Sequence, residues 1–462
     1  MGSVSKYRTR TRWFASVIAM SATAAAWAQT GQTGTPTGPQ TEKPQAPETA
    51  PAKPPSPSPV PAFVSLGPSR EVKLGENTWF RFGAQFQAWA REAQDRILQP
   101  GGGDGGYAFD FYCRRCRFFT TGSVVKDVYF NVLFEASNLG RADPTTGVKS
   151  FAAPSILDAY GQVRFADAFW LSGGSILMPL SRNGTQPTTT YLSIDNANID
   201  NTPVLQGNSN VLRDLGFQAN GFFLANHLEY RVGVFQGSRA ASKGPAAAPT
   251  ATAGHNPPRF VSMLSFNLWD TETGYVNGGH YFGSKKVLGV MGNFDYQILR
   301  NQDPPAPGSS KNPYYGLSAA AFINFPLAGA NPRGGDELVG LLQVGFYDGG
   351  VRGTPSATNF TGTYSNVLKQ WNYLAEGAYY NKNLQFSIFG KFEMRKISNM
   401  YSTAVQGANN QIWVAGGLKY YVAPANLFNF ALQYERVQFP DAPATAQGGT
   451  NNLTFQMQTF LY

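Results

Sequence analysis

The stretch Asn452-Leu-Thr-Phe-Gln-Met-Gln-Thr-Phe-Leu-Tyr462 stands at the end of the sequence and alternates polar with apolar residues. Successive side chains of an extended strand point to opposite faces, so this stretch has one polar and one apolar face. A last strand of this kind is typical of bacterial outer-membrane β-barrels, in which it pairs with the first strand. We therefore expect an all-β transmembrane barrel that this stretch closes.

The register of this last strand stays open at the sequence level. Phe460 and Tyr462 provide the aromatic ending, but the more apolar row has the opposite parity and consists of Leu453, Phe455, Met457, Thr459 and Leu461. Either a bulge near Gln458 and Thr459 switches the two faces, or the final aromatic side chains point inward at the periplasmic rim.

About fifteen further segments alternate in the same way. In the segment 78–91, for example, Phe82 and Phe86 share one face, whereas Gln85 and Gln87 share the other. The predicted strands are 78–91, 109–122, 126–137, 155–165, 169–178, 213–223, 227–236, 259–268, 286–297, 313–325, 338–347, 371–380, 384–395, 411–421, 427–436 and 452–462. A soluble β-sandwich also alternates, but an even number of about sixteen strands is what a bacterial antiparallel barrel requires.

The connections between these strands distinguish a membrane barrel from a soluble β-sandwich better than the strands do. Long connections mostly follow the odd-numbered strands and short links the even-numbered ones, as expected for external loops and periplasmic turns. Both chain ends would then lie in the periplasm. The connection 179–212 is the candidate third loop, which would fold inward and narrow the lumen. The link 269–285 does not fit, because it is too long for a tight turn.

The N-terminal part predicts export followed by a spacer. Residues 1–28 have a basic start, a short apolar run and the small-x-small site Ala26-Trp27-Ala28, which is typical of a signal peptide cleaved near Ala28. Residues 29–62 are rich in Pro and predict a disordered periplasmic spacer, so the barrel domain would comprise residues 63–462.

The composition agrees with a membrane barrel. Charged residues make up only 14% of the chain and aromatic residues another 14%, which is too little charge for a typical soluble surface. Removal of residues 1–28 lowers the formal net charge from +9 to +5, which gives little electrostatic support for nucleic-acid binding. No run of 18 apolar residues predicts a spanning helix.

Several segments together resemble the phosphate-selective porin O and P family, over most of the chain after Trp79. The segments that carry the resemblance are Arg114-Arg115-Cys116-Arg117-Phe118, Asp158-Ala159-Tyr160, Arg213-Asp214-Leu215-Gly216, 229–237, 281–286 and 417–421. The resemblance implies a homotrimer of sixteen-stranded barrels whose lumen carries inward arginines and lysines that pass anions along. Residue by residue, Arg115 and Arg117 match the arginines of the second strand. Arg114 has the parity of the lipid-facing side and would snorkel to the interface.

The alternation predicts which charges face the lumen, and their signs are nearly balanced. The candidate pore-lining or anion-binding cations are Arg81, Arg115, Arg117, Arg164, Arg231, Lys391 and Lys419. Inward carboxylates oppose them, and each such charge could instead pair along the wall. The third loop supplies Arg182, Asp195 and Asp200 to the constriction and is otherwise mostly polar, and Leu177-Met178 stands where the family often has a charged pair. A weak preference for anions is more consistent with this balance than strict phosphate selectivity.

Other chemistry has little support. Cys113 and Cys116 would point to opposite faces of a regular strand, so neither a disulfide nor a metal site fits without a bulge. Three scattered histidines form no catalytic grouping, and no nucleotide-binding loop occurs, so we expect neither an enzyme nor a cofactor or metal.

We therefore expect an outer-membrane porin for passive diffusion of small hydrophilic solutes, with a weak preference for anions such as phosphate. The alternatives are a structural or plugged barrel that tethers the envelope, and a sugar porin. Aromatic side chains in a row along the lumen would mark the sugar porin.

Overall fold

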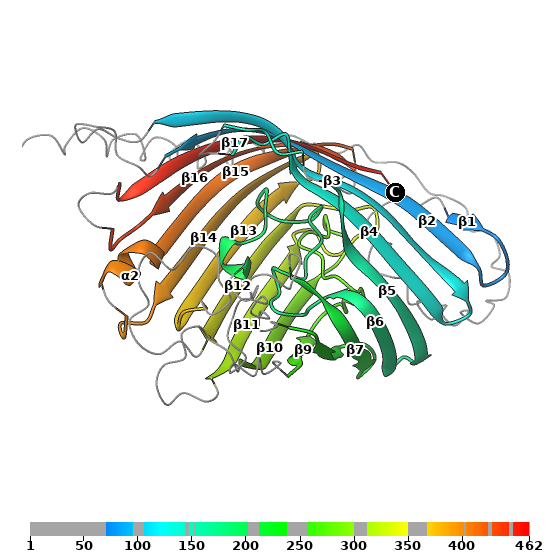
Figure 1. The fold of residues 1–462 in the computed structure, drawn as a ribbon. Helices are drawn as coiled ribbons and strands as arrows, with labels where there is room; N and C mark the ends of the chain where they lie inside the picture. Colours follow the sequence, from blue (N-terminus) through cyan, green and yellow to red (C-terminus); the bar gives the residue numbers. More distant parts are fainter. Residues whose placement is uncertain are drawn as a thin grey trace, which may run out of the picture. The chain divides into compact units, whose positions relative to one another are not determined.

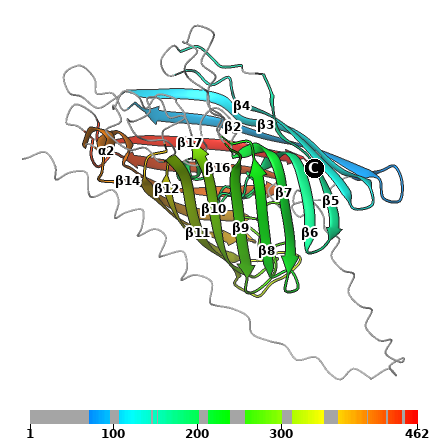
Figure 2. The same ribbon diagram turned by 60° about the horizontal axis from the view of Figure 1, so that its bottom comes forward.

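The computed structural model describes residues 71–95, 106–143, 147–151, 153–201, 212–237, 257–299, 312–349, 367–401, 403–423, 427–442 and 447–461. The predicted signal peptide and spacer lie outside these residues. Sixteen strands, β2 to β17, form a closed antiparallel barrel, because each pairs with its neighbours in the chain and β17 pairs with β2 (Figure 1). Figure 2 shows β6 to β9 side by side on the near wall.

The observed strands agree closely with the predicted ones. They are β2 (Trp79–Gln94), β3 (Tyr107–Val125), β4 (Val128–Leu139), β5 (Ser155–Ala166), β6 (Phe169–Leu177), β7 (Arg213–Phe223), β8 (Leu228–Phe235), β9 (Arg259–Asn267), β10 (Val287–Leu299), β11 (Asn312–Pro326), β12 (Glu337–Asp348), β13 (Gln370–Asn381), β14 (Phe386–Ile397), β15 (Gln411–Ala423), β16 (Phe428–Gln438) and β17 (Gly449–Leu461).

Three short elements add to the barrel. Strand β1 (Glu71–Lys73) pairs with the start of β2, the 3-10 helix η3 (Asn198–Asn201) belongs to the third connection, and helix α2 (Thr403–Asn409) follows β14. Within the described part of the chain, the helices are too short or too polar to cross a membrane.

Strand β17 follows the second of the two expected registers. Its pairing with β16 and β2 runs without a bulge, so Phe455 and Met457 face outward and Gln456 and Gln458 face the lumen. Phe460 therefore points inward, where it is 3% exposed and stacks on Phe119. The closing seam is polar on its inner side, because the side-chain amide of Gln87 donates to Gln458 at 2.5 Å.

Two connections contact the inner wall of the barrel. We call residues 178–212 the third loop, of which 178–201 and 212 are described, and residues 268–286 the inward turn. The inward turn corresponds to the link that was too long for a tight turn. It lies between β9 and β10, and its length is explained by contacts that it makes inside the barrel.

Candidate functional site

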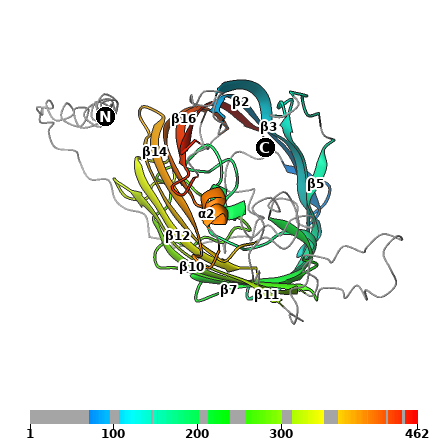
Figure 3. The ribbon, with the colours of Figure 1, turned by 60° about the vertical axis from the view of Figure 1, so that its left-hand side comes forward.

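The third loop crosses the lumen and is bonded to the wall formed by β13 to β15. Figure 3, a view along the barrel, shows green segments inside the ring of strands. Ser193 donates to Glu376 of β13 at 2.7 Å, and the backbone N–H of Ile199 donates to Glu393 of β14 at 3.1 Å. These bonds hold the loop in the lumen, as the sequence predicted for the third connection.

The inward turn supports the third loop from its other side. Arg182 donates from two nitrogens to the two carboxylate oxygens of Glu272, at 2.7 and 2.8 Å, and both side chains are buried. The N–H of Gly279 donates to Thr190 at 3.0 Å. A bidentate guanidinium–carboxylate pair fixes orientation as well as distance, so the two connections form one packed body.

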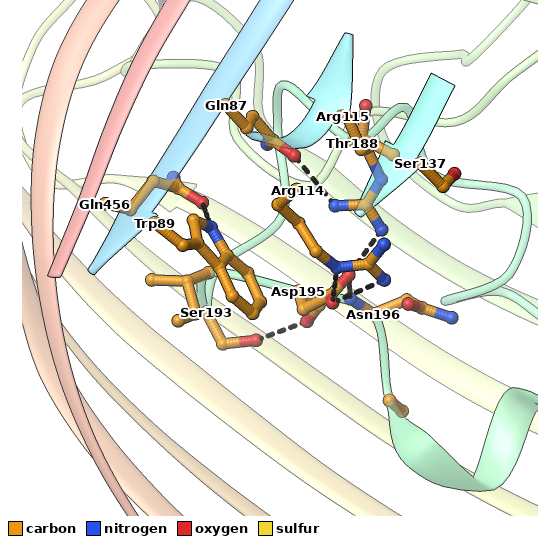
Figure 4. A network of polar contacts seen from close by, with 12 residues as sticks. Gln87, Trp89, Arg114, Arg115, Ser137, Thr188, Ser193, Asp195, Asn196 and Gln456 are labelled. Carbon is orange, nitrogen blue, oxygen red and sulfur yellow. Dashed lines mark hydrogen bonds and ion pairs between the residues drawn. The ribbon is translucent and has the colours of Figure 1, made fainter. Parts of the chain in front are cut away.

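Three charged side chains connect the third loop to β3. We call the space between the loop and this strand the gap. Arg114 Nη2 lies 2.9 Å from one carboxylate oxygen of Asp195, and Arg115 Nη2 lies 2.5 Å from the other. Arg115 also donates to Gln87 of β2 at 2.8 Å (Figure 4). We call Arg114, Arg115 and Asp195 the clamp.

A β-bulge in β3 makes the clamp. Gln87 is opposite Arg115 and Ala88 is opposite Cys113, so Arg114 is the extra residue in β3. Two adjacent side chains of a bulge can point to the same face of a sheet. The prediction that Arg114 faces lipid is therefore wrong, because parity counting assumes a regular strand.

The same bulge overturns the predicted separation of the two cysteines. Cys113 and Cys116 lie opposite Ala88 and Phe86, which are two residues apart on β2 and share its outer face. Both cysteines thus lie on the outer face of the barrel, whereas a regular strand would have put them on opposite faces.

Cavities lie on both sides of the clamp. The outer chamber has a volume of about 210 Å³ and is lined by Trp89, Arg91, Tyr112, Arg114, Asn138, Arg141, Ile194, Asp195, Asn196, Asn198, Lys391, Gln433, Glu435 and Thr454. The inner chamber, of about 40 Å³, is lined by residues that include Arg115, Arg117, Tyr191 and Arg213. Asn196 lines both chambers, which places the clamp at their boundary.

The pKa values of the two carboxylates in the third loop are shifted in opposite directions. Burial by itself would raise the pKa of Asp195, but Arg114 and Arg115 outweigh it and hold that pKa well below its usual range. Burial raises the pKa of Asp200 to about 7, although hydrogen bonds from Ser181 and Gln343 favour its charged form. At neutral pH the clamp therefore keeps its negative charge, whereas Asp200 is partly protonated.

Of the other predicted site residues, Arg117 and Lys391 line the chambers beside the clamp. Arg117 pairs with Glu135 at 2.5 Å and donates to Thr188 of the third loop at 2.7 Å. Lys391 lines the outer chamber and pairs with Glu393 at 2.9 Å. These residues, with the clamp, form the charged surface around the gap.

The remaining predicted residues lie elsewhere. Arg81 pairs with Glu71 of β1 at 2.7 Å, and Arg164 pairs with Asp127 and Asp167, which lie in the short turns before β4 and after β5. The structure does not bring either of them to the gap.

Four predicted residues hold the body inside the barrel. Arg231 is buried against Glu229 and donates to the carbonyl of Tyr275 in the inward turn. Lys419 donates to the carbonyl of Tyr191 at 2.5 Å. Arg182 and Asp200 belong to the third loop but face the inward turn and the wall rather than the gap.

Sequence reasoning left out some residues at the site. Arg213 begins β7, pairs with Asp158 at 3.1 Å and lines the inner chamber. Arg141 lines the outer chamber, where its guanidinium lies over the ring of Tyr112. Arg141 lies in a connection, where alternation carries no information, and the bulge that turns Arg114 inward has no clear sequence signal.

Comparisons with known proteins support the fold. No family model matches the chain, and no curated protein matches its sequence. The chain is similar to solved outer-membrane porins: OmpF of Salmonella typhi, in a complex with daunomycin, has 11% identity and a TM-score of 0.51, covering 85% of this chain and 100% of OmpF. OprB of Pseudomonas putida, in a high-pH structure, has 9% identity and a TM-score of 0.53, covering 82% and 94% respectively. The chain thus folds as a closed sixteen-stranded antiparallel barrel, and this fold is similar to that of the outer-membrane porins.

Proposed function

We propose that the protein is an outer-membrane porin through which small hydrophilic solutes diffuse passively, with a weak preference for anions such as phosphate. The observation that carries this proposal is the clamp, with a chamber on either side that is lined by arginine side chains. In this proposal the protein is exported, acts as a homotrimer in the lipid bilayer and needs neither a cofactor nor catalysis.

The preference for anions follows from the side chains that line the two chambers. Seven of them are cationic, namely Arg91, Arg114, Arg115, Arg117, Arg141, Arg213 and Lys391, whereas two, Asp195 and Glu435, are acidic. Guanidinium groups suit phosphate and carboxylates because they offer a planar set of donors and stay charged. Glu135, Asp158 and Glu393 neutralise three of the cations, so the preference is weak.

The zero-current potential across a planar bilayer under a KCl gradient tests this proposal. We expect steady single-channel currents. The zero-current potential should be small, and its sign should indicate a preference for chloride over potassium. Clear cation selectivity would exclude the anion preference, and a lack of conductance in reconstituted, folded protein would exclude the pore. Empty detergent added to the same bilayer is the control.

A plugged barrel is the second candidate, and the contacts of the third loop favour it. The loop bonds to β3 through the clamp and to β13 and β14 through Ser193 and Ile199, so it meets opposite walls. The conductance measurement separates the two candidates, because a plugged barrel folds normally but gives no channels.

A sugar porin is the third candidate. Trp89 and Tyr112 contact each other edge to face at 5.9 Å and line the outer chamber. Swelling of proteoliposomes in neutral sugars tests it: a sugar porin would pass a neutral disaccharide faster than an uncharged polyol of equal size.

A further inference from the structure

The two cysteines of the chain flank the bulge that makes the clamp. Cys113 precedes Arg114 and Cys116 follows Arg115. Because the bulge adds one residue to β3, both cysteines point to the outer face, opposite Ala88 and Phe86. The sequence Cys-Arg-Arg-Cys thus places two thiols on one face and two guanidinium groups on the other.

The two thiols are close enough to be joined. The opposing residues of β2 are two positions apart, which corresponds to a Cα separation of roughly 6.6 Å. A disulfide bridges Cα atoms about 4.4–6.8 Å apart when the side chains point to the same side. The register of β3 against β2 gives the Cys113 and Cys116 side chains the shared outer face and the short spacing that such a bridge needs.

We propose that Cys113 and Cys116 form a disulfide bond across this bulge after export. The bond would close a short ring around Arg114 and Arg115 on the outer face of β3. Loss of the bulge would return β3 to regular alternation and turn one of the two arginines toward lipid. The disulfide therefore holds the backbone conformation that lets both arginines reach Asp195.

The reaction needs an external oxidant, and a protein disulfide of the oxidising compartment supplies it. One cysteine thiolate attacks a sulfur of the oxidant and forms a mixed disulfide. The second thiolate then attacks the cysteine sulfur of that bond, forms Sγ–Sγ and releases the oxidant as a dithiol. In total, two electrons and two protons pass from Cys113 and Cys116 to the oxidant.

The oxidising periplasm and the small number of cysteines favour a disulfide between Cys113 and Cys116. Exported bacterial chains pass through a periplasm in which disulfides form and persist. The chain has two cysteines, so neither has another intramolecular partner. The inference rests on the export that the proposed function includes, but it does not require conduction.

Counting thiols in the full-length exported protein tests the proposal. Cells are quenched in acid to stop thiol exchange, and the protein is then unfolded in detergent and treated with N-ethylmaleimide before and after reduction. We expect no maleimide adduct before reduction and two afterwards, measured by intact mass. Two adducts before reduction would overturn the proposal, and so would disulfide-linked dimers on a non-reducing gel.

Two variants make the count independent of folding and conduction. The matched control Cys113→Ala leaves Cys116 without its partner and should take up one maleimide before reduction. The variant Cys113→Ser with Cys116→Ser should take up none under either condition. A protein without conductance that still shows the expected counts would refute the pore and leave the disulfide standing.

Discussion

The two sides of the third loop use the same kinds of side chains in different settings. On the anchor side, toward β13, β14 and the inward turn, Arg182 and Glu272 are buried and bidentate. On the clamp side, toward β3, Arg115 is also buried, but Arg114 and Asp195 are each 21% exposed at their side chains and line a chamber. An arginine–carboxylate pair thus fixes the loop on one side and lies between the two chambers on the other.

The difference teaches that solvent access, and not residue type, decides what such a pair does. A buried pair that loses one partner leaves an uncompensated charge in a poorly solvated place. A pair beside a water-sized chamber can separate, because water and mobile ions solvate the freed charges. We therefore expect substitutions on the anchor side to change stability and those on the clamp side to change conduction.

The largest effect is expected for Arg182→Ala on the anchor side. The substitution leaves Glu272 buried without its bidentate partner, which costs roughly 3 kcal/mol in the free energy of unfolding. Urea unfolding of the reconstituted protein, followed by its heat-sensitive mobility on gels, measures this loss. The double variant Arg182→Ala with Glu272→Ala should lose less than the sum of the two single variants. Full additivity would show that the pair contributes no coupling.

The next effect is expected for Arg115→Ala combined with Arg117→Ala on the clamp side. The loss of two guanidinium groups beside the gap should reduce or abolish the anion preference. Glu135 loses its buried partner, so stability should fall as well, but the barrel should remain folded. The zero-current potential measures this preference, and Arg164→Ala is the matched control because it removes a cation that pairs near the end of β5, away from the clamp. Unchanged selectivity in the double variant would show that these arginines are structural.

A smaller effect is expected from pH, through Asp200. Its pKa of about 7 in the folded protein exceeds the value of about 3.9 in an unfolded chain. The folded state therefore binds the proton more tightly, so this contribution to stability is complete below about pH 4 and is lost as pH rises through 7. The melting temperature of the Asp200→Asn variant should change less between pH 4 and 8 than that of the wild type. Parallel pH profiles for the two proteins would contradict this assignment.

The smallest effect is expected for Arg164→Ala itself. Its ion pairs with Asp127 and Asp167 are partly exposed, and exposed pairs contribute about 0.2–1 kcal/mol. Urea unfolding should show a change near the lower end of this range. If Arg164→Ala lowered the free energy of unfolding as much as Arg182→Ala does, solvent exposure would not explain which ion pairs stabilise the protein.

The barrel could be predicted from the sequence because alternation is local. Each strand needs an apolar outer face and a polar inner face, so its pattern survives without knowledge of its partners. The ends of β7, Arg213–Phe223, were predicted to the residue. The length of the link 269–285 also indicated an unusual connection, although not its place in the lumen.

The clamp could not be predicted, because it depends on one irregular position and on contacts distant in the sequence. Parity placed Arg115 correctly but misplaced Arg114, since a single bulge shifts the count. The partner of Arg182 is Glu272, 90 residues away, and alternation gives no information about a loop that binds another loop. The sequence thus placed Asp195 in the third loop without indicating which charges it meets.

The single-channel conductance of Asp195→Asn relative to the wild type tests the central claim most directly, namely that the clamp limits the passage. The substitution removes the charge that holds Arg114 and Arg115 across the gap and leaves the anchor side intact. We predict a conductance higher by about twofold or more and a stronger anion preference, because two unpaired guanidinium groups would face the gap. A conductance and selectivity equal to those of the wild type would contradict the claim.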